Sequence, residues 1–171
     1  MSRPRVAVSA CLLGEAVRWD GAHKRDAYVT DELARLVELV PVCPEVEIGL
    51  GVPREPVRID LVDGERRLVA PGIGSDHTAA MRAYAEREVT ELRRLGIAGC
   101  VLKSRSPSCG VRDTPVHPDG GEPTDPGPGS FTEVLQARLP GLPIEDERAL
   151  QEPSARASFL ECVFDYARTH R

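Results

Sequence analysis

The sequence predicts a three-layer, Rossmann-like α/β fold with a mostly parallel sheet. Three short apolar runs, residues 5–11, 39–43 and 97–102, have the length and composition of buried strands. Segments in which apolar residues recur with helical spacing lie between these runs and after them. Strands that alternate with helices usually pair in parallel, because each helix crosses over the sheet before the next strand begins.

The first half of the chain contains two of these strands and one helix. Residues 5–11 form the first predicted strand, which ends before a glycine turn. Residues 29–39 have apolar side chains at intervals of three and four, so they predict a helix with Thr30 or Asp31 as its amino-terminal cap. The second strand, residues 39–43, ends at a proline, which cannot donate a ladder hydrogen bond.

A hairpin and the longest helix are predicted next. Residues 57–62 and 67–70 alternate apolar and polar side chains on either side of Asp63 and Gly64, a pair that favours a tight hairpin turn. Residues 75–95 have one continuous apolar face and end at a glycine, which predicts a long amphipathic helix. The third strand follows directly.

The remainder of the chain begins with an irregular segment. Residues 110–129 are rich in proline and glycine, so they are expected to form a loop or a lid rather than packed structure. Residues 131–139 predict a short helix and residues 142–144 an edge strand. Residues 154–169 predict a terminal helix with Cys162 on its buried face.

Length and composition indicate one domain, residues 1–171, that resides in the cytoplasm. A net charge of −5 argues against a broad surface for nucleic-acid phosphates, and no apolar run approaches the roughly 20 residues that span a bilayer. Five cysteines are an odd number without the spacing of a disulfide framework. A reducing compartment and a small-molecule partner are therefore expected, and the sequence leaves the oligomeric state open.

Three cysteines each lie in a short motif that ends a predicted strand. Cys11, Cys43 and Cys109 should converge, because the carboxyl ends of parallel strands meet at one edge of a sheet. Three thiolates at one point would form a metal or cluster site that lacks one protein ligand and keeps a position for substrate. A single cysteine is also often a small core residue, and Cys100 and Cys162 are interpreted in that way.

Charged residues near these cysteines are candidates for binding and proton transfer. Glu45 comes two residues after Cys43 and could act as a general base, although Glu47 could serve equally and a solvated loop acid is a third reading. Arg18 and His23 belong to a polar cluster after Cys11. No phosphate-binding glycine loop is present, which argues against a nucleotide-driven reaction.

The segment SRSPSCG supplies hydroxyl groups beside two cations. Ser104, Ser106 and Ser108 alternate along it, and Lys103 and Arg105 flank the first serine. Hydroxyl groups and cations at the end of a strand can bind an anion or a carbonyl oxygen. An ordinary serine–proline turn is the alternative interpretation.

Five segments together resemble the TudS-type 2-thiouracil desulfidase family, long described as a domain of unknown function. They occur in the family's order: SACLLG, RWDGAHK, VPVCPEVEIGLGVPR, GSDHT before a long helix, and VLKSRSPSCG. The resemblance covers residues 6–110 and, more weakly, the remainder of the chain. The combination of segments is specific, whereas no single segment is.

The resemblance implies a 4Fe–4S cluster with one iron that no protein group ligates. Matched position by position, the ligands would be Cys11, Cys43 and Cys109. The implied enzyme is an iron–sulfur-dependent desulfidase that hydrolytically removes sulfur from thiouracil or thiouridine monophosphate, with sulfide leaving onto the open iron. The chain lacks the extra carboxyl-terminal domain of larger relatives, which favours a free base or mononucleotide over tRNA.

The resemblance also implies roles for other residues. Glu45 would be the acid/base that activates water. Lys103, with Ser104, Ser106 or Ser108, would orient the pyrimidine ring or stabilise its developing charge. The residues expected to bind substrate are Arg18, His23, Arg54 and Ser108.

Three alternatives stay open at this point. A zinc-dependent hydrolase could use the same cysteines, although the H-x-E and PCxxC signatures of zinc deaminases are absent. A cluster-bearing sensor or sulfur-binding module would need no catalytic base, although no basic DNA-binding face is evident. The third alternative is an α/β domain in which the thiols have no function.

Overall fold

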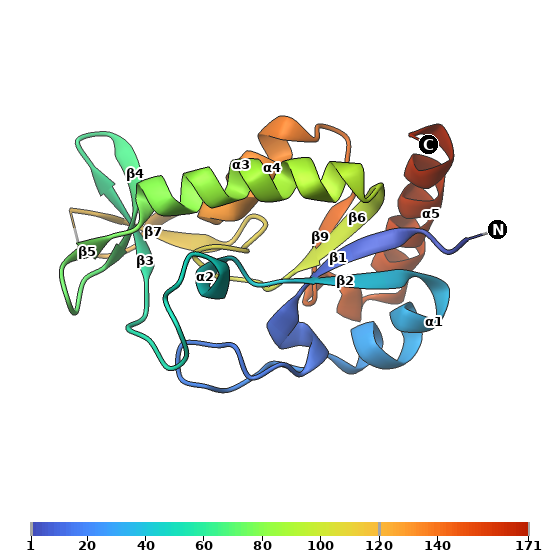
Figure 1. Cartoon of the computed structure of the whole chain (residues 1–171), viewed down its shortest axis with the longest axis horizontal. Helices are drawn as coiled ribbons and strands as arrows, with labels where there is room; N and C mark the ends of the chain where they lie inside the picture. Colours follow the sequence, from blue (N-terminus) through green and yellow to red (C-terminus); the bar gives the residue numbers. More distant parts are fainter. Residues whose placement is uncertain (1, 120, 171) are drawn as a thin grey trace.

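The computed structural model describes residues 2–119 and 121–170, which form two sheets linked by one long helix (Figure 1). The first sheet is parallel throughout, as its neighbouring strands all run in the same direction. Its strands, in spatial order, are β2 (Glu38–Val42), β1 (Arg5–Ser9), β6 (Ile97–Leu102) and β9 (Ile144–Asp146). The predicted mixed α/β fold with a parallel sheet is confirmed.

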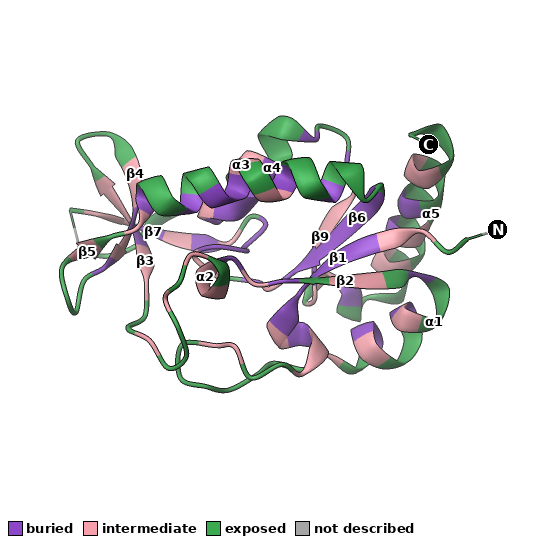
Figure 2. Ribbon diagram, viewed as in Figure 1, coloured by how far each residue is buried: buried purple, intermediate pink, exposed green. Residues whose placement is uncertain are grey.

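Helices cover both faces of the parallel sheet. On one face, α3 (Thr78–Arg94) and α4 (Ser130–Arg138) pack on side chains such as Ala7 and Cys100. On the other face, α5 (Pro153–Thr169) and the π-helical η2 (Tyr28–Leu33) pack on Val6, Val8 and Val101. The two sets of strand residues alternate because successive side chains point to opposite faces. Figure 2 shows β1 and β6 buried between these layers.

The second sheet contains the predicted hairpin. Its strands, in spatial order, are β5 (Ser75–Asp76), β4 (Glu65–Ala70), β3 (Arg58–Val62), β7 (Thr114–Pro118) and β8 (Thr124–Gly127). β3 and β4 are antiparallel and turn at Asp63 and Gly64, both with positive φ, as a tight hairpin requires. The amino-terminal part of α3 packs on β4, so this helix connects the cores of the two sheets.

The prediction that residues 110–129 form a loop or lid is wrong. This segment contains β7, which pairs in parallel with β3, and β8, which pairs with β7. Thr114 and Val116 are buried. Pro126 is tolerated because it lies in β8, an edge strand whose backbone is paired on one side only. In the central strand β7, Pro115 lies at an irregularity of the pairing with β8 and Pro118 is the last residue.

Two helices also differ from their predictions. The first ends at Leu36 in α1 (Ala34–Leu36), and Asp26 caps it by accepting a hydrogen bond from the Val29 N–H at 3.0 Å. Cys162 in α5 is exposed, because the buried stripe of this helix is narrow and is formed by residues such as Phe159 and Val163. Cys100 is buried, as predicted. No helix in the described part of the chain combines the length and apolarity that crossing a membrane requires.

The amino terminus of α4 fixes the loop that carries Cys109. The Phe131 N–H donates a hydrogen bond to the Ser108 carbonyl at 3.0 Å, and the Thr132 hydroxyl donates to the Cys109 carbonyl at 2.9 Å. The two segments approach so closely that a Cβ atom on Gly129 would lie 2.5 Å from the Ser108 carbonyl. Glycine at this position is therefore a packing requirement.

We expect Gly129→Ala to lower the free energy of unfolding by about 1–3 kcal/mol, because the added methyl group pushes α4 away from the loop. Gly127→Ala is the matched control, since a Cβ atom there would meet only Arg66 Nη2 at 3.8 Å. Urea denaturation followed by circular dichroism measures both changes. Equal stability of the two variants would contradict the packing argument.

Candidate metal centre

A cavity of about 280 Å³ opens at the carboxyl ends of β1, β2 and β6. This is the edge of a parallel sheet at which ligands usually bind. Its lining includes all three cysteines of the predicted site together with charged and hydroxyl side chains from the same strand ends. The lining residues used below are Cys11, Arg18, Trp19, Cys43, Glu45, Arg54, Lys103, Ser104, Arg105, Ser106 and Cys109.

Each cysteine is placed by a turn that follows a strand. Cys11 lies in the short 3-10 helix η1 (Ala10–Leu13), directly after β1. Cys43 follows β2 and caps α2 (Pro44–Glu47), where Pro44 is at the start of the helix, a position that proline favours. Cys109 lies in the loop between β6 and β7, and its N–H donates a hydrogen bond to Ser106 Oγ at 3.0 Å.

Burial favours the protonated form of the three thiols, and the nearby cations Arg18, Lys103 and Arg54 only partly oppose it. Burial raises the pKa of Cys11 to about 11 and also raises the pKa values of Cys43 and Cys109. A hydrogen bond from the Val46 backbone partly opposes this effect at Cys43. Because thiolates are the metal-binding form, a metal centre here would displace protons as it binds. The donor set fits a thiophilic centre such as an iron–sulfur cluster.

The arrangement of the three thiols bears on which kind of metal centre they could hold. Over residues 2–119 and 121–170, no three His, Cys, Asp or Glu side chains are placed so that they could share one metal ion. A zinc site needs its ligands around one centre, whereas a 4Fe–4S cluster distributes its thiolates over different iron atoms. Three thiols that line one cavity are compatible with a cluster of this kind.

Glu45 is held in a fixed orientation beside the cysteines. Its Oε1 accepts a hydrogen bond from Arg54 Nε at 3.1 Å, and its Oε2 accepts one from the Ser108 hydroxyl at 3.0 Å. The side chains of Arg54 and Glu45 are 6% and 13% exposed. Glu47 instead is exposed and lines a separate cavity beside α3. Of the two glutamates considered from the sequence, only Glu45 lies in the cysteine cavity.

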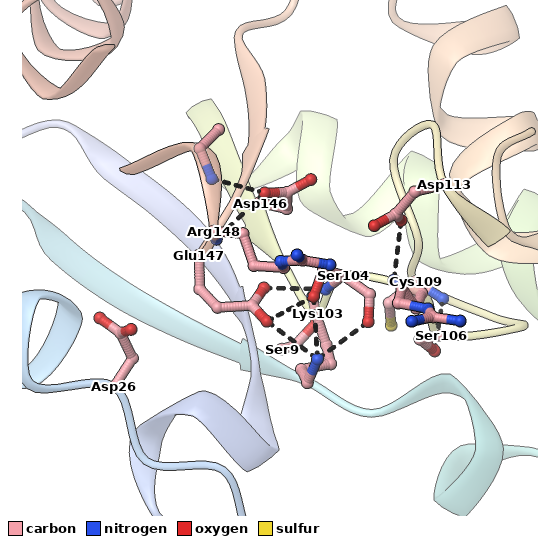
Figure 3. A network of polar contacts seen from close by, with 12 residues as sticks. Ser9, Asp26, Lys103, Ser104, Ser106, Cys109, Asp113, Asp146, Glu147 and Arg148 are labelled. Carbon is pink, nitrogen blue, oxygen red and sulfur yellow. Dashed lines mark hydrogen bonds and ion pairs between the residues drawn. The ribbon is translucent and has the colours of Figure 1, made fainter. Parts of the chain in front are cut away.

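A second ion pair joins Lys103, which lines the cavity, to Glu147 (Figure 3). Lys103 Nζ contacts Glu147 Oε1 at 2.9 Å, and the Ser104 hydroxyl donates a hydrogen bond to the same oxygen at 2.6 Å. Burial acts to raise the pKa of Glu147, but the hydrogen bonds from Lys103 and Ser104 outweigh it and hold that pKa below the ordinary value of 4.5. Glu147 is therefore charged at neutral pH.

The other predicted residues have different environments. Ser106 lines the cavity, whereas Ser108 is fully buried behind Glu45. Arg18 lines the cavity, and its Nε is buried without a hydrogen-bond partner among the described residues. His23 is exposed and is not among the lining residues; its Nδ1 accepts a hydrogen bond from the Arg25 N–H. The structure brings together every predicted site residue except His23.

Two residues near the cavity were not predicted from the sequence. Glu147 directly follows β9. Functional residues are expected at the carboxyl ends of parallel strands, and this expectation located the cysteines. It did not indicate Glu147 because the strand was predicted two residues too early. Trp19 is the sole tryptophan of the chain, lines the cavity and is 44% exposed. An exposed tryptophan at a cavity is unusual, and that signal was available only from the structure.

Comparisons with known proteins agree on one family. The sequence pattern of 2-thiouracil desulfurase matches residues 6–147. The solved structure of a 4Fe–4S-dependent thiouracil desulfidase, TudS, is similar with a TM-score of 0.72 and 32% identity, covering 91% of this chain and 99% of that one. The uncharacterized protein YbbK of Bacillus subtilis (strain 168) is 30% identical over 114 residues, which are 61% of this chain and 72% of the relative.

We expect Arg54→Met to lower the free energy of unfolding by about 3 kcal/mol, because it leaves the buried Glu45 carboxylate without its cation. Arg94→Met is the control: Arg94 pairs with Glu91, but its side chain is 75% exposed, so a change of less than about 1 kcal/mol is expected. Urea denaturation compares the two variants. A similar loss in both would contradict a buried, structurally important pair at Glu45.

Proposed function

The chain belongs to the 2-thiouracil desulfurase family, and we propose that it removes sulfur from thiolated pyrimidines with a 4Fe–4S cluster bound by Cys11, Cys43 and Cys109. One observation carries this proposal: three strand-end thiols line the same cavity as a buried, oriented glutamate. The proposed reaction is hydrolytic, in which the C=S group and water give a C=O group and hydrosulfide.

The cluster would supply what the side chains cannot. When bound through three cysteines, it would offer a soft, Lewis-acidic iron without a protein ligand to the thiocarbonyl sulfur. The protein's own residues would then position water and substrate around the carbon that loses sulfur. Such a cluster would hold the three cysteines as thiolates in spite of their burial, releasing their protons as it binds.

Glu45 is proposed as the general base. Arg54 and Ser108 hold its two carboxylate oxygens, so the side chain keeps one orientation toward the cavity. It would take a proton from water as the oxygen adds to the thiocarbonyl carbon, and it could return that proton to the departing sulfur. Arg54 and Ser108, which were expected to bind substrate, are proposed instead to orient this base.

Ser106 is proposed as the hydroxyl donor to the substrate. Its Oγ accepts hydrogen bonds from the N–H groups of Ser108 and Cys109 at 3.2 and 3.0 Å. Among the described residues its own proton has no acceptor, so that proton is available to a ring nitrogen or carbonyl oxygen of a pyrimidine. Lys103 would add positive charge nearby, where negative charge develops on the ring.

Arg18 is proposed to bind the anionic part of a substrate. Its Nε is buried in the cavity wall without a partner in the described structure, and a buried donor of this kind normally meets an acceptor. A phosphate group would satisfy it, which favours thiouridine monophosphate over the free base. His23 has no role in this proposal because it lies outside the cavity.

The first test is the composition and activity of protein purified without oxygen. We expect about four iron and four sulfide per chain, and hydrosulfide release from 2-thiouracil or 4-thiouridine monophosphate. Cys43→Ala should lose iron, whereas Cys162→Ala, at an exposed position, should retain it. Stoichiometric zinc would refute the cluster, and a cluster without any hydrosulfide release would instead support the sensor or sulfur-binding alternative.

Glu45→Gln should retain iron and lose at least about a hundredfold in kcat, because it removes the base but keeps the side chain's size. Glu47→Gln is the matched control two residues away, outside the cysteine cavity, and should turn over normally. Steady-state hydrosulfide release measures both. Normal turnover by Glu45→Gln would exclude Glu45 as the base.

A further inference from the structure

Glu147 lies at the carboxyl end of β9, the fourth strand of the parallel sheet. We propose that it is a positioning residue for the reaction proposed above, holding the Lys103 ammonium and the Ser104 backbone in place at the cavity wall. It acts through these two residues. This inference rests on the proposed desulfidase function and assigns a role to a residue that the sequence did not indicate.

Both carboxylate oxygens of Glu147 accept hydrogen bonds from Lys103 or Ser104. Oε1 accepts hydrogen bonds from Lys103 Nζ at 2.9 Å and from the Ser104 hydroxyl at 2.6 Å, while Oε2 accepts one from the Ser104 N–H at 2.8 Å. Figure 3 shows the three side chains directed toward one another. The side chains of Lys103 and Glu147 are only 17% and 12% exposed. Contacts between charged groups so shielded from water are stronger than those on the surface.

The network determines what Lys103 can do. An ammonium group has three protons, and Lys103 Nζ has three acceptors: Glu147 Oε1, the Ser104 carbonyl at 2.9 Å and Ser104 Oγ at 3.0 Å. The backbone N–H of Lys103 donates a hydrogen bond to Oγ of Ser9, the last residue of β1, at 2.9 Å. Lys103 is therefore fixed and its protons are occupied, so it contributes charge at a set position rather than a hydrogen bond to substrate.

The two acidic residues that precede Glu147 contact other parts of the structure. Asp146 caps the 3-10 helix η3 (Ala149–Gln151) by accepting hydrogen bonds from the N–H groups of Arg148 and Ala149, at 3.1 and 2.8 Å. Glu145 pairs with Arg112 at 3.0 Å. Of these three consecutive acids, Glu147 is the one that contacts residues lining the cavity at the end of β6. Its neighbours therefore provide matched controls.

The charge of Glu147 balances that of Lys103. Replacement by glutamine keeps the size of the side chain and an oxygen acceptor for the Ser104 N–H, but it leaves the Lys103 cation without a counter-charge beside the cavity. An anionic nucleotide should then bind more tightly, while a neutral base should bind unchanged. At the same time, a less firmly held Lys103–Ser104 segment should slow the reaction of both substrates.

The experiment compares Glu147→Gln and Glu145→Gln, both purified as the iron-loaded enzyme. We expect Glu147→Gln to retain its iron and to lose about tenfold in kcat for 4-thiouridine monophosphate and for 4-thiouracil. Its KM should fall by about fivefold for the nucleotide and stay constant for the base. Glu145→Gln should match the wild type. Adding Lys103→Met to Glu147→Gln should return the ratio of the two KM values to that of the wild type.

Several results would overturn the inference. A kcat within twofold of the wild type, or equal KM changes for the two substrates, would show that Glu147 does not position Lys103. Iron loss in proportion to lost activity would show that it maintains the fold or the cluster instead. Calorimetric titration with UMP tests the charge effect independently of turnover, with tighter binding to Glu147→Gln expected and equal affinity contradicting it. Failure of the wild type to release hydrosulfide would instead defeat the proposed function.

Discussion

The parallel pairing of β1 with β2 and β6 is the constraint on which the site depends. Ser9 pairs with Val42, so the last residues of β1 and β2 lie side by side, and Cys11 and Cys43 follow within two residues of that point. Val8 pairs with Val101 in β6, whose end leads into the Cys109 loop. Backbone hydrogen bonds thus set the approach of three thiols that are far apart in sequence.

Two buried ion pairs stand beside these thiols, and stability alone does not explain them. Burying a charge carries a large desolvation cost, which a partner only partly offsets, so apolar residues would often stabilise such a position as well or better. Glu45 with Arg54 and Lys103 with Glu147 both lie at the cavity, where oriented charges can act on a reaction. Their placement is therefore better explained by chemistry than by folding.

Sequence patterns predicted the parts of this fold that have strong local signals. The strand at residues 97–102 and the hairpin turn at Asp63 and Gly64 follow from apolar composition and turn chemistry, and both are present. β7 was missed because its pairing with β3 is a long-range contact, while its prolines are typical of loops. Glu147 was missed because its strand was predicted two residues too early, which hid its place at the sheet edge.

The three serines of the SRSPSCG segment show why the sequence could not predict the role of each side chain. All three have the same side chain, but their hydroxyl groups make different hydrogen bonds. Ser104 donates to Glu147 and Ser108 donates to Glu45, whereas the Ser106 oxygen accepts hydrogen bonds from two backbone N–H groups. A hydroxyl whose proton is already used supports a neighbour, whereas one that is preorganised by its acceptor contacts can donate to a ligand. The distinction between supporting and reacting groups is therefore a property of the folded network, which no spacing within the segment encodes.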